Sequence, residues 1–137
     1  MFDTYTTVLG NVATPPKSFV VPSGASMVTF RLASTPRKYD KEKGGWKDCP
    51  SSFYTVVAWK MLGENIAGSV SVGDPLMVMG RLRVREWEGD KQRHTVAEIE
   101  AISVGHDLSR GTSAFRRVVR PHADPLPPDT VTLTRTR

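Results

Sequence analysis

The chain has 137 residues and a hydrophobic fraction of 39%, which fits one globular domain with a core and excludes a wholly disordered protein. It has no run of about 18 apolar residues, and its N-terminus lacks a basic region followed by an apolar one. Neither a membrane-spanning helix nor a signal peptide is therefore expected. The single cysteine, Cys49, cannot form an intrachain disulfide, which is typical of a cytoplasmic protein.

Positive charge is concentrated in two parts of the sequence. The formal net charge is +5, with seven basic and three acidic residues between Arg31 and Lys60, and five basic and two acidic residues between Ala114 and Arg137. This distribution favours a polyanion as the partner, although a surface charge of this size is also common in proteins without such a partner.

Two strands are predicted in the first quarter of the chain. Residues 4–12 are rich in threonine and β-branched residues, and residues 26–34 alternate, with Val28, Phe30 and Leu32 on one face. The prolines and the Ser-Gly pair between these strands predict a loop with room for a short extended piece.

A long polar segment separates the second strand from the third. Residues 35–52 contain several lysines and glycines and predict a basic, mobile hairpin loop. Residues 52–60 then alternate as a strand, with Phe53, Val57 and Trp59 on one face. Because Val57 lies between the two aromatic residues, this face is either a binding face or part of the hydrophobic core.

A short amphipathic helix is predicted over residues 61–70, where Leu62, Ile66 and Val70 recur at a spacing of four. Two glycines within this segment lower its intrinsic helix propensity. We therefore expect the helix to depend on packing against the rest of the domain.

The most informative stretch is the strand predicted for residues 76–87, LMVMGRLRVREW. Successive side chains on a strand point to opposite faces, so one predicted core face has Leu76, Val78, Gly80, Leu82 and Val84. The other face has Met77, Met79, Arg81, Arg83, Arg85 and Trp87. Arginines beside an aromatic ring suit single-stranded nucleic acid, because cations follow the phosphates and the ring stacks on any base. The alternative is a solvated outer face whose arginines protect an edge from aggregation.

A turn at residues 88–90 and a strand over residues 94–104 complete the predicted elements. The order strand, strand, strand, helix, strand, strand is that of the OB-fold, an all-β five-stranded barrel with one short helix between its third and fourth strands. We expect this domain to occupy residues 1–110. Residues 111–137 contain four prolines and an excess of basic residues, and they predict a flexible C-terminal tail.

Several segments, taken in order, resemble one protein family. They are VLGNV (8–12), VPSGASMVTFRLAS (21–34), KYDKEKGGWKD (38–48), VVAWKMLGEN (56–65), VGDPLMVMGRLRVREWEGD (72–90) and HTVAEIEAISVGHDL (94–108). Together they resemble the bacterial single-stranded DNA-binding proteins of the homotetrameric OB-fold type. The ordered series is more specific than any single motif.

The resemblance implies a protein without enzymatic activity, cofactor or metal that coats single-stranded DNA, with little sequence preference, in replication, recombination or repair. In the family, bases stack on aromatic residues at positions that match Phe53, Trp59, Trp87 and either Tyr39 or Trp46. Phe53 stands where a larger indole is often found, which we expect to weaken stacking there. We expect the DNA backbone to be contacted by Arg31, Arg81, Arg83, Arg85 and Lys60, with help from the loop residues Lys41, Lys43 and Lys47.

The resemblance also implies a homotetramer built as a pair of dimers. In the family the first strand pairs with its symmetry mate, which predicts an interface containing Tyr5, Thr7 and Leu9, while Tyr54 matches a position at the contact between dimers. Many members end in an acidic, aromatic-tipped tail that recruits enzymes. This sequence ends in TVTLTRTR and resembles a paralogue without that tip, so recruitment by this route is not expected.

Three alternatives remain open from the residues alone. An RNA-binding or primosome-type OB module would share the arginines and aromatics, and so would a paralogue that only oligomerises. An enzyme would need a reactive site, and Glu86, Glu88, Asp90 and His94, around one hairpin, are the type of ligands that hold a divalent ion. The same residues are more simply a turn and the start of a strand, and the sequence has no glycine-rich phosphate loop.

Overall fold

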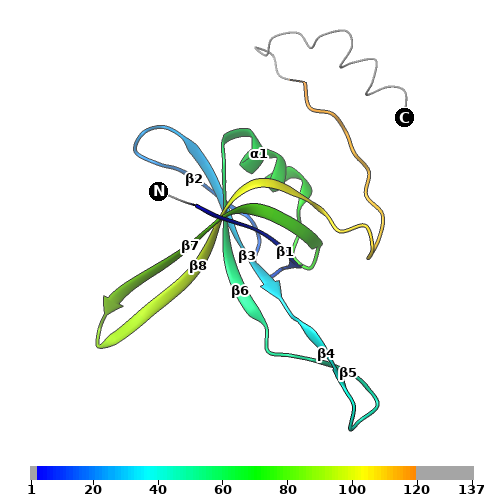
Figure 1. Ribbon diagram of the computed structural model, residues 1–137. Coiled ribbons are helices and arrows are strands. Elements are labelled where there is room, and N and C mark those ends of the chain that lie inside the picture. The colour runs from blue at the N-terminus through cyan, green and yellow to red at the C-terminus, as the bar shows by residue number, and fades with distance from the viewer. Residues whose placement is uncertain (1–2, 120–137) are drawn as a thin grey trace.

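The computed structural model describes residues 3–119, in which one helix accompanies eight strands (Figure 1). The elements are β1 (Thr4–Val12), β2 (Lys17–Val20), β3 (Ser26–Ser34), β4 (Arg37–Asp40), β5 (Gly45–Asp48), β6 (Ser52–Trp59), α1 (Lys60–Ser69), β7 (Pro75–Gly89) and β8 (Gln92–His106). The first two long strands, β1 and β3, have the bounds that the sequence pattern predicts. The short strand β2 is the extended piece expected in the proline-containing loop.

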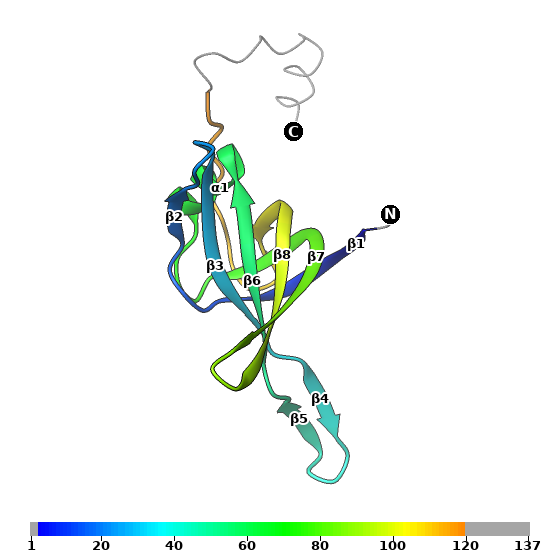
Figure 2. The same cartoon turned by 90° about the vertical axis from the view of Figure 1, so that its left-hand side faces the viewer.

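The main sheet closes into a barrel. Its strand order is β1-β7-β8-β6-β3-β2, and β1 pairs again with β3 through Asn11 opposite Ala33 and Val12 opposite Leu32. Strands β6 and β8 are parallel, whereas the other pairs are antiparallel. Five strands thus form a ring, with β2 added at the outer edge of β3 (Figure 2). This is the OB-fold, and the prediction made from the element order is confirmed.

The inward side chains of the five strands form the core. The largest fully buried side chains are Leu32, Leu76, Ile99, Val56 and Val78, which come from β3, β6, β7 and β8. Helix α1 contacts β3, β6 and β8 and buries Ile66 against this core. A Cβ at Gly63 would lie 2.7 Å from the carbonyl oxygen of Ala58, so a glycine lets the helix approach the sheet this closely.

Two hairpins extend as arms from one end of the barrel (Figures 1 and 2). One is the outer part of β7 and β8, and the other is the pair β4 and β5 within the predicted long loop. The prediction that Val84 belongs to the core face is wrong, because Val84 is 60% exposed. Its alternation is correct, but β7 has left the barrel at this point and has no core beneath it.

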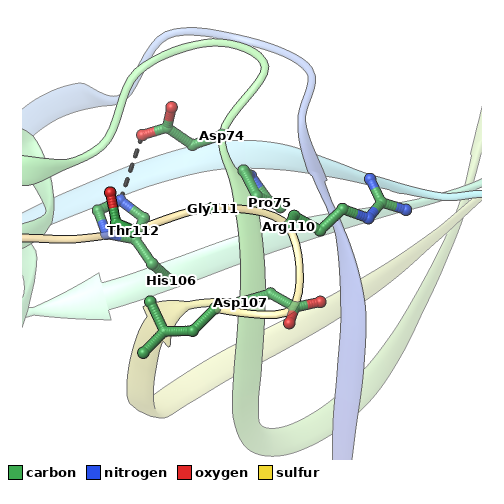
Figure 3. Close-up of a pocket in the computed structure, with 8 residues that line it drawn as sticks. Asp74, Pro75, His106, Asp107, Arg110, Gly111 and Thr112 are labelled. Carbon is green, nitrogen blue, oxygen red and sulfur yellow. Dashed lines mark hydrogen bonds and ion pairs between the residues drawn. The ribbon is translucent and has the colours of Figure 1, made fainter.

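The segment after β8 contacts the barrel at His106, the last residue of β8. The Nε2 atom of the His106 imidazole lies 3.3 Å from the Asp74 carboxylate (Figure 3). Its Nδ1 atom lies 2.6 Å from the Ser113 hydroxyl. The pKa of Asp107 is lowered because the hydroxyl and then the backbone N–H of Ser109 donate hydrogen bonds to its carboxylate. Residues 111–119 are exposed and have no regular secondary structure, and residues 120–137 of the predicted tail lie outside the described residues. The division of the chain at residue 110 stays a prediction.

Candidate nucleic-acid interface

The outer face of β3 and β6 has an aromatic ring beside a cation. The Phe53 ring is 48% exposed, and the Arg31 guanidinium lies over it at 5.0 Å from the ring centre. On the same face, the Trp59 indole is half-buried and its Nε1–H donates a hydrogen bond of 3.3 Å to Glu100 on β8. Both aromatic residues lie on the outer surface of the barrel, whereas Val57 between them is buried, so this face combines solvent-accessible rings with a buried aliphatic residue.

The arginine row of β7 lies on the same outer face, but its members differ in their partners. Arg81 forms an ion pair of 2.8 Å with Glu100 and lies 3.7 Å from Asp3, and Arg85 lies 3.4 Å from Glu98. Arg83 is exposed and has no ion pair within residues 3–119.

Sequence reasoning missed the two glutamates of β8. A signal was present, because Glu98 and Glu100 alternate in register with the arginines once the hairpin turn is placed. Two of the three arginines are therefore compensated by acids on the neighbouring strand, and Arg83 is the member of the row best placed to meet an external anion.

Trp87 lies on the arm formed by β7 and β8. Its indole is 47% exposed and stacks on His94, directly across the hairpin, with the ring centres 5.3 Å apart and the planes at 23°. The stack covers part of one side of the indole and holds the ring in position. His94 was considered from sequence only as a metal ligand, and its stacking on Trp87 was not foreseen.

The other arm brings together the two alternative stacking residues. Tyr39 and Trp46 are directly opposite each other in the β4–β5 hairpin and pack edge to face at 5.5 Å between ring centres. Both rings are exposed and lie side by side, and which of them stacks on a base stays a prediction. The loop lysines Lys41, Lys43 and Lys47 are exposed on the same arm.

Lys60 stands apart from the arginine row. It is the first residue of α1 and turns the chain out of β6 with a left-handed φ of 56°, a conformation that non-glycine residues rarely adopt. Its side chain is exposed at this junction.

The predicted oligomer interface lies over β1 and the neighbouring part of β7. Tyr5, Thr7 and Leu9 are exposed, and Leu9 and Thr7 lie opposite Met77 and Met79, which are also exposed. Tyr54 is half-buried and packs against the core cluster. The structure therefore places the three β1 residues on a common apolar surface and Tyr54 on the opposite side of β6 from Phe53.

Within residues 3–119, no three side chains of the histidine, cysteine, aspartate or glutamate type are grouped to hold a metal ion, which includes the hairpin acids and His94. In the same range, no helix is long and apolar enough to cross a membrane. What the geometry offers is a surface of exposed rings and cations.

The fold and the site together define an OB-fold barrel with an aromatic and cationic outer face. The model of the Single-strand binding protein family matches residues 4–107, and this chain belongs to that family. The resemblance found in the sequence segments is thus confirmed.

Relatives and solved structures agree with this assignment. The chain is 53% identical over 117 residues to single-stranded DNA-binding protein 2 of Streptomyces avermitilis, covering 85% of this chain and 73% of the relative. It is 47% identical to single-stranded DNA-binding protein 1 of Streptomyces coelicolor, covering 93% and 81% respectively. The crystal structure of the small single-stranded DNA-binding protein from Streptomyces coelicolor superposes with a TM-score of 0.73 at 42% identity, covering 81% of this chain and all of that chain.

Proposed function

We propose that this chain binds and coats single-stranded DNA with little sequence preference. The observation that supports this most strongly is the pairing of Arg31 with Phe53 on an outer barrel face that also has Trp59 and Arg83. Exposed rings accept any base because every base has a π-face, and free cations follow the phosphates. The names of the relatives, which are single-stranded DNA-binding proteins, support the same function.

The two arms extend this surface beyond the barrel. Trp87 on the β7–β8 arm and the Tyr39–Trp46 pair on the β4–β5 arm both present exposed rings, and the arms diverge from the same end of the barrel (Figure 2). In our proposal, DNA crosses the barrel face over Trp59 and Phe53 and then contacts these rings. The lysines of the β4–β5 arm add positive charge along the path of the DNA. Lys60 adds a positive charge at the junction of β6 and α1.

The experiment that tests this function is quenching of tryptophan fluorescence by oligo-dT, recorded over a range of salt concentrations. Quenching is expected because indoles stack on the bases, and binding must weaken as salt rises because contacts to phosphates release counterions. An affinity that stays flat over a wide salt range would contradict the proposal. Competition between DNA and RNA oligomers of equal length separates it from an RNA-binding module, for which RNA would win.

We further propose that the chain assembles as a homotetramer, a dimer of dimers. Tyr5, Leu9, Met77 and Met79 leave apolar surface exposed on one side of the barrel, and such a contiguous patch is typical of an interface. Phe115 and Val119, after the barrel, are exposed apolar residues that fit a clasp on a neighbouring subunit. Light scattering tests this, because a mass near that of one 15.1 kDa chain would exclude the tetramer.

In this proposal the assembled protein works in the bacterial cytoplasm, where replication, recombination and repair expose single-stranded DNA. A passive coating protein needs no catalytic group, cofactor or metal for this role. Metal-dependent turnover of an oligonucleotide by the purified protein would therefore contradict the proposal.

A further inference from the structure

We propose that the edge strand β2 provides an additional nucleotide subsite, in which Phe19 stacks on a base and Lys17 contacts a phosphate. This subsite rests on the proposed function and extends the DNA path past Trp59, away from the arms. The strand was expected from sequence only as a short extended piece without a role.

The strand register places Phe19 in one row with Trp59. Phe19 lies opposite Met27 on β3, and Met27 lies opposite Trp59 on β6. Residues directly opposite each other in antiparallel strands share a face, and Met27 alternates with the buried Val28, so the row lies on the outer surface. Phe19 is two strand spacings from Trp59, or about 10 Å, with an apolar thioether side chain between the rings.

The exposure of Phe19 is close to that of two of the proposed stacking residues. Its side chain is 46% exposed, compared with 48% for Phe53 and 47% for Trp87, and it is not part of the core cluster. All four residues of β2 are exposed, so the strand contributes little to the core. A base is the occupant we assign to this ring because the neighbouring charge on the same face is positive.

Lys17 is that neighbouring charge. It lies two residues before Phe19, opposite Thr29, and therefore projects from the same face of the sheet. Within residues 3–119 it has no ion pair, unlike Arg81 and Arg85. Its ammonium group is therefore available for a phosphate, and Arg31 lies two residues beyond Thr29 on β3 with its guanidinium over Phe53.

The charges around Trp59 favour a path toward β2. On the β8 side, the indole contacts Glu100, whose carboxylate is already paired with Arg81. On the β2 side, Met27 of β3 lies next to the indole, and Phe19 and the unpaired Lys17 of β2 lie beyond it. A phosphodiester backbone that leaves Trp59 toward β8 thus first meets the Arg81–Glu100 ion pair, whereas one that leaves toward β2 meets an uncompensated cation.

The test compares Phe19 variants for binding to oligo-dT of increasing length. Phe19→Ala and Phe19→Leu should each weaken binding of a long oligomer roughly five- to hundredfold, the usual effect of losing one stacked base, and Phe19→Trp should restore it. The leucine variant keeps an apolar side chain at the edge, so a loss in Phe19→Leu together with rescue in Phe19→Trp identifies stacking. Val20→Ala is the matched control, because Val20 is exposed on the opposite face of β2 and should leave the affinity unchanged.

The charge contact has a separate measurement. Lys17→Ala should lower the slope of log affinity against log salt by about 0.7, the value for one phosphate on a single strand. If Phe19→Leu and Lys17→Ala bind long oligomers like the parent while Trp59→Ala is weakened, the subsite is wrong and the proposed function stands. If the parent itself does not bind oligo-dT, the proposed function fails and the subsite fails with it.

Discussion

Arg81 and Glu100 form an ion pair of 2.8 Å on the outer face of the barrel, and the same carboxylate accepts a hydrogen bond from Trp59. One carboxylate thus connects a cation and an indole that the sequence analysis treated as independent DNA contacts. Arg83, two residues further along β7, has no such partner within residues 3–119. This difference separates two arginines that look equivalent in the sequence.

We therefore expect Arg83→Ala and Arg81→Ala to behave differently. Arg83→Ala should lower the salt slope of oligo-dT binding by about 0.7, because one free phosphate contact is lost, with folding stability unchanged within about 0.5 kcal/mol. Arg81→Ala should instead lower the free energy of unfolding by up to about 1 kcal/mol, since it leaves Glu100 and Asp3 without their cation. Salt titrations and urea unfolding of both variants check this, and equal slopes in parent and Arg83→Ala would contradict it.

Stacking should be separable from charge. Trp59→Ala and Trp87→Ala should each reduce the binding free energy by about 1–3 kcal/mol, the range for one stacked base, and leave the salt slope nearly unchanged. Titrations with oligo-dT at several salt concentrations measure both quantities. If Trp87→Ala binds like the parent and only unfolds more easily, Trp87 has a structural role and no base stacks on it.

Gly80 should be intolerant of any side chain. It lies at the β-bulge where the β7–β8 register shifts, and a Cβ there would overlap the carbonyl oxygen of Glu100 and lie 2.8 Å from the Cα of Ala101. Because these are backbone atoms, Gly80→Ala should lower the free energy of unfolding by about 1–3 kcal/mol or more. Gly105→Ala is the control, since nothing lies within 4 Å of a Cβ at that position of β8. Equal stability of the two variants in urea unfolding would show that the bulge adapts.

The barrel was predictable because its strands alternate with period two over a closed core. Leu76 and Val78 are buried on the face that the alternation predicts as core. Val84 was not predictable, because periodicity cannot show where a strand leaves the barrel.

The face of the site was predictable, but its electrostatics were not. Phe53 and Trp59 were assigned correctly to one strand face. The β7–β8 register determines which acids pair with Arg81 and Arg85, and it also places His94 against Trp87. This register is set by the hairpin turn, and the sequence pattern of each strand alone does not give it. A hairpin loop was predicted for residues 35–52, but its strands β4 and β5 were missed because each has four residues and is highly polar.

The last prediction concerns the contact between dimers. Tyr54 is half-buried in the single chain and projects from β6 on the side opposite Phe53 and Trp59. In a symmetric contact each residue meets its own copy or a fixed partner, so Tyr54→Arg would place like charges across the interface. We expect this variant to shift a tetramer toward dimers in light scattering at moderate salt, while the DNA-binding face of each barrel is retained. Tyr54→Phe is the control, because it removes only the hydroxyl and keeps the ring. Because Tyr54 packs against the core, both variants must first be shown to unfold cooperatively with a melting temperature near that of the parent protein. A folded Tyr54→Arg protein with the unchanged mass of a tetramer would place the contact between dimers elsewhere on the barrel.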